Sequence, residues 1–131
     1  RLSVGDPLER STVVGPVISE VHRDRVEGYV ASGVDAGAEA VAGGSRPDLE
    51  RGYYVAPTLL AGCTPDMRPV REEIFGPVVV VVPFDDEEEA VALANDSDFG
   101  LYSYVFSGDS PRAYQVARRL RSGSVESALK K

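Results

Sequence analysis

Hydrophobic residues recur every three or four positions in two parts of this 131-residue chain. That spacing places them along one side of a helix, which can then cover a sheet. The first predicted helix starts after Ser19, a residue type that caps helix N-termini, and stops at Gly37. The second starts at Ser110-Pro111, where a cap residue precedes a proline of the first turn, and stops at Gly123.

Two shorter helices are predicted from their flanking residues. Asp85 and Glu88 form a start similar to a capping box, and the acidic residues 85–89 lie where a helix N-terminus stabilises negative charge. Residues 65–72 are predicted to form a short helix or turn. This turn leads the chain into the segment at residues 72–77.

Runs rich in β-branched and aromatic residues predict the strands. They cover residues 39–42, 53–60, 78–82 and 101–106. The consecutive valines at 78–82 are typical of a strand covered on both faces, so this strand is expected at the centre of the sheet. Pro57 has no N–H for a strand ladder and therefore favours an edge or a break. The alternation of strands and helices indicates the α/β class, with an open, mostly parallel sheet and flanking helices.

Composition and charge narrow the function classes. A chain of 131 residues with 43% hydrophobic residues is expected to form one domain, residues 1–131. Its net charge of −7 repels nucleic-acid phosphates and anionic lipids, so neither nucleic acid nor a membrane is an expected partner. The longest apolar stretch is far shorter than the ~20 residues that span a bilayer, and no signal peptide opens the chain. A soluble, cytoplasmic protein is predicted.

The segment Glu-Glu-Ile-Phe-Gly-Pro at residues 72–77 carries the most informative chemistry. In an extended segment residues i and i+2 share a face, so Glu73 and Phe75 are expected to point the same way. A carboxylate with both oxygens free accepts hydrogen bonds from two ribose hydroxyls, and an aromatic ring forms an apolar wall for a flat heterocycle. This pair therefore predicts a site for the nucleoside end of a cofactor.

The same segment resembles one in the NAD(P)-dependent aldehyde dehydrogenases, where the Glu chelates the nicotinamide ribose and the Phe packs near the nicotinamide ring. The resemblance implies that Glu73 and Phe75 bind the cofactor, that the intact enzyme uses NAD or NADP, and that it oxidises a small-molecule aldehyde to a carboxylic acid. It covers nearly the whole chain in the family's order. The further blocks that carry it are Gly5-Asp6-Pro7-Leu8, Gly15-Pro16-Val17-Ile18-Ser19, Gly52-Tyr53-Tyr54-Val55-Ala56-Pro57-Thr58, Pro83-Phe84, Ala94-Asn95-Asp96-Ser97-Asp98-Phe99-Gly100-Leu101 and Gly123-Ser124-Val125.

The resemblance also implies an incomplete, aldehyde dehydrogenase-like catalytic domain. In that family the nucleophilic Cys, the general-base Glu, the oxyanion-hole Asn and the dinucleotide-binding fold precede the matching part. After Val125 the family usually continues with an aromatic residue and Asn, whereas Glu126 and Ser127 follow here. The family's Gly-rich closing segment and last oligomer-forming strand are not matched. No catalytic residue is therefore assigned in this chain, which alone is expected to be inactive and to bind no cofactor detectably.

Three other features have ordinary structural explanations. Cys63 lacks the family's nucleophile surroundings and is predicted to be a loop or core residue. His22 lies among charged residues without a Cys or His at ligand spacing, so it is predicted to be a solvated helix residue. The acidic residues 85–89 lack the pattern of a calcium loop. No metal site is predicted.

A second class of function stays open, that of a non-catalytic α/β interaction or oligomerisation module. An incomplete sheet with an apolar strand leaves unpaired edges and exposed apolar surface, which recruit other chains. A homo-oligomer is therefore expected for the chain by itself. An autonomous nucleotide-binding domain has less support, because neither G-x-G-x-x-G nor a P-loop follows a predicted strand.

Overall fold

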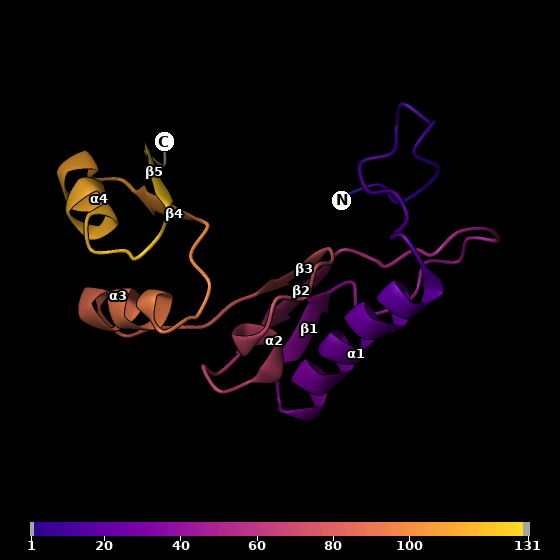
Figure 1. Cartoon of the computed structure of the whole chain (residues 1–131), viewed down its shortest axis with the longest axis horizontal. Coiled ribbons are helices and arrows are strands. Elements are labelled where there is room, and N and C mark those ends of the chain that lie inside the picture. The colour runs from indigo at the N-terminus through magenta and orange to yellow at the C-terminus, as the bar shows by residue number, and fades with distance from the viewer. Residues whose placement is uncertain (1, 130–131) are drawn as a thin grey trace. The chain divides into compact units, whose positions relative to one another are not determined.

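A computed structural model of the chain describes residues 2–129 (Figure 1). The chain divides into two compact units, Arg1–Pro83 and Phe84–Lys131. The first unit contains α1 (Glu20–Asp35), β1 (Glu39–Ala42), β2 (Thr58–Ala61), α2 (Arg68–Arg71) and β3 (Val78–Val80). The second unit contains α3 (Glu87–Asn95), β4 (Tyr102–Ser107), α4 (Ser110–Ala117) and β5 (Ser124–Leu129).

Helix α1 has the predicted boundaries. The Ser19 hydroxyl accepts a hydrogen bond from the backbone N–H of His22 at 3.1 Å, which satisfies a free donor of the first turn. At the other end Gly37 adopts a φ of 105°, a conformation that a residue with a Cβ rarely takes. Its N–H donates to the carbonyl of Val34 at 2.9 Å. The chain therefore leaves the helix at Gly37 and continues into β1.

The sheet of the first unit has the order β1-β2-β3. β2 is antiparallel to β1 and parallel to β3. The expectation that the valine run forms the central strand, covered on both faces, is wrong for this chain. β3 lies at the edge of its sheet, and Val79 in its middle is 60% exposed, because β3 pairs on one side only among the described residues. β2 is the central strand, and it begins at Thr58, directly after the proline predicted to break it.

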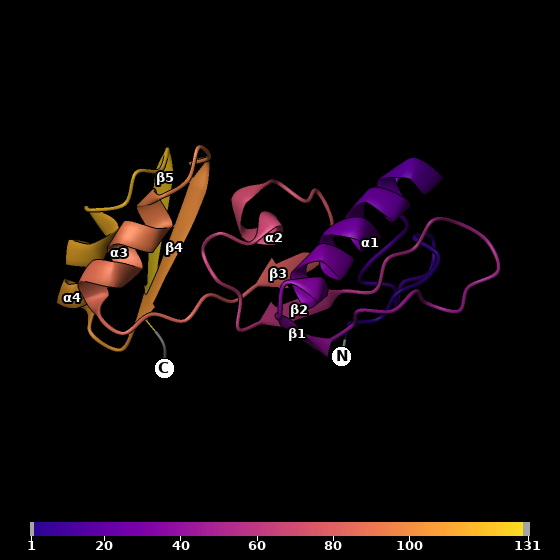
Figure 2. The ribbon, with the colours of Figure 1, turned by 90° about the horizontal axis from the view of Figure 1, so that it is seen from below.

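The core of the first unit lies between the helices and one face of this sheet. Figure 2 shows α1 and α2 on the same face. Leu60, which is fully buried in β2, clusters with Val30 of α1 and Met67 before α2. Val26 of α1, also fully buried, clusters with Ile74. Full burial of side chains of this size contributes about 1.5–3 kcal/mol each. These contacts fix α1 against the segment that leads into β3.

The second unit pairs β4 with β5 in parallel, from Tyr102 opposite Ser124 to Ser107 opposite Leu129. β5 was not predicted, since half of its six residues are polar and they do not alternate with the apolar ones. Two of the three strand pairs among the described residues are parallel, and helices flank both sheets, so the α/β, mostly parallel class is confirmed.

Caps of α3 and α4 differ by one residue from the prediction. Asp86 and not Asp85 caps α3, through a bond from the Glu89 N–H at 2.9 Å. Asp109 caps α4 in the same way, one residue before Ser110. In each case the aspartate carboxylate accepts the hydrogen bond from the N–H of the third residue of the helix.

Helix α4 ends at Ala117, well before the predicted stop at Gly123. The side chain of Asn95, the last residue of α3, accounts for the difference. Its amide donates to the carbonyl of Arg119 at 2.8 Å, and its oxygen accepts from the Arg121 N–H at 2.7 Å. These two bonds satisfy backbone groups that the helix would otherwise use, so the chain turns away and enters β5. None of the helices within residues 2–129 has the length and apolar character needed to span a bilayer.

Candidate cofactor-binding site

The segment at residues 72–77 connects α2 to β3 in the first unit. Ile74 is buried in the core, whereas its neighbours Glu73 and Phe75 are exposed, Phe75 to 68%. Glu73 and Phe75 line the same open hollow of about 350 Å³, together with Glu72, Ile74, Gly76 and residues of α2 and β3. The carboxylate of Glu73 makes no hydrogen bond or ion pair with any other residue of the described range 2–129. A free carboxylate and an exposed ring thus share one concave surface.

The segment was expected to be extended, but its backbone departs from this conformation at Phe75. Phe75 has a φ of 55° and is the one non-glycine residue with a positive φ among those described. Bulky residues avoid this left-handed region, and strained backbone of this kind concentrates at ligand-binding and active sites. The sequence predicted that the two side chains share a face, but not the left-handed backbone at Phe75.

One face of α1 holds the backbone of the segment. His22 Nε2 donates to the carbonyl of Phe75 at 2.6 Å, and Arg25 Nη2 donates to the carbonyl of Glu73 at 3.0 Å. His22 was predicted to be a solvated helix residue; it lies on α1 and is partly exposed, but its ring is bonded to the segment, which was not predicted. Gly76 packs so closely on the fully buried Val26 that an added Cβ would lie 2.7 Å from both Val26 methyl carbons.

Unlike Glu73, Glu72 takes part in a network of hydrogen bonds. The Tyr29 hydroxyl donates to Glu72 Oε2 at 2.7 Å, and Arg68 Nε donates to Oε1 at 3.2 Å. The hydrogen bond from Tyr29, followed by that from Arg68, lowers the pKa of Glu72 below its ordinary value. The Arg68 guanidinium also lies 4.3 Å from the centre of the Tyr29 ring. Glu72 is thereby fixed as an anion that joins α1, α2 and the segment.

These contacts come from one side of α1. His22, Arg25, Val26 and Tyr29 follow one another at helical spacing, and all four touch residues 72–76. The apolar members were recognised as a core stripe. Of the polar members, His22 was assigned to solvent, because no sequence pattern identifies a backbone carbonyl on another element as its partner.

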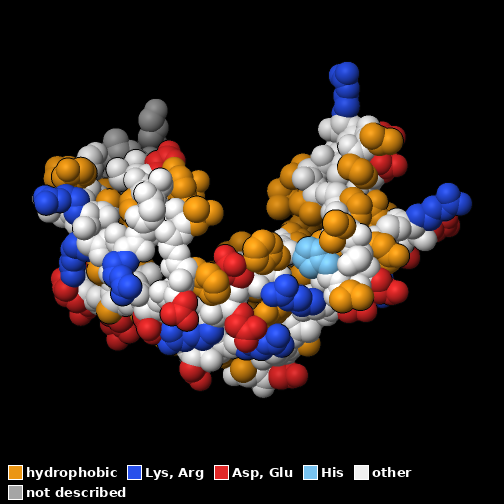
Figure 3. Space-filling model, in the orientation of Figure 1, with side chains coloured by type: hydrophobic (Ala, Val, Ile, Leu, Met, Phe, Trp, Pro, Cys, Tyr) orange, Lys and Arg blue, Asp and Glu red, His pale blue; other side chains and the backbone are white. Residues whose placement is uncertain are grey.

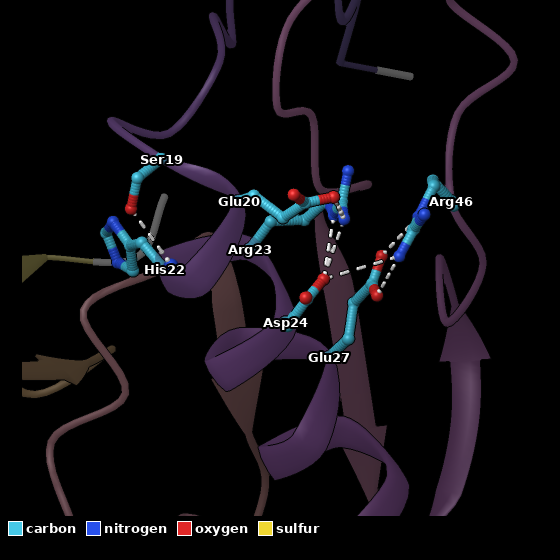
Figure 4. A network of polar contacts seen from close by, with 7 residues as sticks. All are labelled: Ser19, Glu20, His22, Arg23, Asp24, Glu27 and Arg46. Atoms are coloured by element: carbon cyan, nitrogen blue, oxygen red, sulfur yellow. Dashed lines mark hydrogen bonds and ion pairs between the residues drawn. The ribbon is translucent and has the colours of Figure 1, made fainter.

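A second polar cluster on α1 lies around its N-terminal turns (Figure 4). Arg23 pairs with Glu20 and Asp24, each at 2.8 Å, and Arg46 pairs with Glu27 at 2.5 Å. The Arg46 contact lowers the pKa of Glu27. Exposed pairs of this kind contribute little to stability, typically about 0–1 kcal/mol. The ion pair of Arg46 with Glu27 connects the loop that contains Arg46 to α1. Each charged side chain named here has a partner of opposite charge within the cluster.

Cys63 is a core residue, as predicted. It is 1% exposed, and its thiol faces the carbonyl of Leu60 at 3.6 Å. A nucleophilic cysteine needs access and a lowered pKa, usually from a nearby cationic group. Within residues 2–129, no group of three or more His, Cys, Asp and Glu side chains could hold a metal ion.

The sequence has extensive similarity to known proteins. The model of the aldehyde dehydrogenase family matches residues 1–128. A betaine aldehyde dehydrogenase of Rhizobium leguminosarum bv. trifolii is 47% identical over 124 residues, which cover 93% of this chain and 26% of that protein. A geranial dehydrogenase of Castellaniella defragrans is 46% identical over 123 residues, with coverage of 94% and 26%. The chain spans about a quarter of the length of the curated relatives it matches.

Solved structures agree with this relationship. The aldehyde dehydrogenase of Mycobacterium tuberculosis, complexed with NAD+, superimposes with a TM-score of 0.94 at 41% identity, over 99% of this chain and 27% of that one. An NAD-dependent aldehyde dehydrogenase from Sinorhizobium meliloti gives a TM-score of 0.91 at 47% identity, over 96% and 25%. The chain belongs to the aldehyde dehydrogenase family.

Proposed function

We propose that this chain is part of an NAD(P)-dependent aldehyde dehydrogenase, and that Glu73 and Phe75 position the nicotinamide end of the cofactor. Both units are then parts of one catalytic domain of the full-length enzyme, meaning an aldehyde dehydrogenase of full family length that carries these residues. The observation that carries the proposal is the free Glu73 carboxylate beside the exposed Phe75 ring in one hollow. Relatives with NAD+ bound support NAD as the cofactor.

The residues of the hollow fit this cofactor end. The two oxygens of Glu73 accept hydrogen bonds from adjacent ribose hydroxyls, and the Phe75 ring covers one side of a flat heterocycle. Bound NAD(P)+ supplies the hydride acceptor of the reaction. The contribution of this chain is orientation, since a cofactor held in one pose removes motion that would otherwise oppose the reaction. The nucleophile and the general base are proposed to lie in other parts of the enzyme.

The chain by itself is expected to form no NADH from NAD+ and an aldehyde. Its single cysteine is buried, and covalent catalysis needs an accessible, activated nucleophile. The absorbance of NADH, with betaine aldehyde as the first substrate because several relatives carry that name, measures the reaction. In the full-length enzyme Cys63→Ala is expected to leave turnover unchanged. NADH formation by the chain alone, abolished by Cys63→Ala, would show that the assignment is wrong.

A second candidate function, association with another copy of the chain, is favoured by one exposed row of aromatic side chains. Tyr102, Tyr104 and Phe106 alternate along β4 and lie exposed, with ring centres 4.8 Å and 6.2 Å apart in sequence order. Figure 3 shows hydrophobic side chains at the surface over the sheet of the second unit. Contiguous exposed apolar surface of this kind marks interaction sites. We therefore propose a homo-oligomer.

Sedimentation velocity over a concentration series tests this association. The sedimentation coefficient of the chain is expected to rise with concentration, and replacement of Tyr104 and Phe106 by serine is expected to weaken the rise. Tyr114→Ser, on α4, also removes an exposed aromatic ring and serves as the matched control. A chain that stays monomeric at every concentration would rule out this second function.

A further inference from the structure

We propose that His22 is a positioning residue of the cofactor site, which holds Phe75 in its left-handed backbone conformation through a hydrogen bond to the Phe75 carbonyl. The effect of His22 on catalysis rests on the proposed function, whereas the link between His22 and Phe75 does not. That link joins the first turn of α1 to a residue 53 positions later in the sequence.

His22 is well placed to act as a fixed donor. Its backbone N–H is bonded to the capping hydroxyl of Ser19, so the residue lies in an ordered first turn of α1. The ring Nε2 lies 2.6 Å from the Phe75 oxygen. A carbonyl oxygen can only accept, so Nε2 carries the hydrogen. The neutral Nε2–H tautomer and the imidazolium both satisfy this requirement, so protonation does not remove the bond.

Phe75 needs such an external restraint. At a φ of 55° its Cβ is crowded by the backbone, and residues in this region persist only where the surroundings hold them. The Phe75 side chain is mostly exposed and cannot supply the restraint by packing. The peptide unit that follows Phe75 is held from two sides instead, by His22 at the carbonyl and by Val26 against Gly76.

The restraints on either side of Phe75 have different roles. Arg25 holds the carbonyl of Glu73, and the buried Ile74 side chain anchors the residue between. These two contacts hold the chain on the N-terminal side of Phe75. His22 bonds to the carbonyl of the peptide unit that directly follows the Phe75 Cα, so it restrains the way this residue turns. Without it the peptide unit can rotate to a relaxed conformation, and the ring leaves its place beside Glu73.

Substitution of His22 in the full-length enzyme separates this role from general stability. His22→Gln keeps an amide N–H near the position of Nε2, whereas His22→Asn places its amide near Nδ1 and out of reach of Phe75. We expect His22→Ala and His22→Asn to lower kcat/KM for NAD by about two- to tenfold, the range for one neutral hydrogen bond, and His22→Gln to restore it. Arg23→Ala, on the same turn but facing Glu20 and Asp24, is the control for effects on the helix.

Crystal structures of the same variants without cofactor report on the geometry alone. In His22→Ala and His22→Asn we expect Phe75 to leave the positive-φ region, and in His22→Gln to keep it. A positive φ at Phe75 in His22→Ala would overturn the proposal, whatever the kinetics. If Phe75 relaxes as expected while kcat/KM for NAD stays unchanged, the link between the two residues stands and the proposed cofactor role of Phe75 fails.

Discussion

Replacing Glu73 by glutamine in the full-length enzyme is expected to lower cofactor affinity or turnover about ten- to a hundredfold. The amide keeps the size of the side chain but loses the negative charge and one of its two acceptor oxygens. Hydrogen bonds to a charged group are worth ~1.5–3 kcal/mol, which corresponds to this range of rates. Steady-state kinetics with NAD and aldehyde varied separately, together with cofactor titration, measure the effect.

The fold should be unaffected, because Glu73 is exposed and its carboxylate has no partner within the described residues. The unfolding temperature of Glu73→Gln is therefore expected to match that of the parent. Glu50→Gln, which makes the same chemical change at another exposed position, serves as the control and should leave both kinetics and stability unchanged. Normal cofactor and aldehyde kinetics in Glu73→Gln would mean that this carboxylate does not contact the ribose.

Gly76→Ala is expected to destabilise the protein by about 1–3 kcal/mol, the usual cost of overpacking a filled core. Its Cβ would meet both methyl carbons of Val26 at 2.7 Å, and this α1 side chain is fully buried. The segment must then move away from α1, which also displaces Glu73 and Phe75. Chemical denaturation and cofactor kinetics together measure the two effects.

Gly28→Ala provides the matched control for this substitution. Gly28 lies within α1, and an added Cβ there would meet no heavy atom within 4 Å. Alanine at an open helix position is expected to stabilise the protein, by about 0.5–1 kcal/mol. In Gly76→Ala/Val26→Ala the steric conflict is relieved, so the two costs should not add. Equal stability of Gly76→Ala and the parent would show that the segment is not packed against α1 as described.

Local sequence signals predicted those parts of the fold that local chemistry determines. Ser19 and Gly37 define α1 because a cap hydroxyl and a left-handed glycine act within one turn. Pro57 directly precedes β2, because a proline has no N–H to donate to the hydrogen bonds between strands. The alternation within residues 73–75 predicted that Glu73 and Phe75 share a face, and both side chains line one hollow while Ile74 is buried.

The sequence-based predictions fail where a residue far away in the sequence determines the local structure. β5 has as many polar as apolar residues, and it forms because it pairs in parallel with β4. α4 ends early because Asn95, from another helix, binds the backbone beyond it. The valine run is typical of a central strand, but in the described residues β3 has a neighbour on one side only. The contact of His22 was missed for the same reason, since its partner is the backbone carbonyl of Phe75, far along the chain.

The most direct test of the proposed site is the crystal structure of the full-length enzyme with NAD bound. We expect both carboxylate oxygens of Glu73 within hydrogen-bond distance of the two hydroxyls of the nicotinamide ribose, and the Phe75 ring against the nicotinamide, with its left-handed backbone retained. A nicotinamide ribose bound elsewhere, with the Glu73 carboxylate in solvent and the Phe75 ring away from the cofactor, would contradict the assignment of this segment as the cofactor-positioning part of the enzyme.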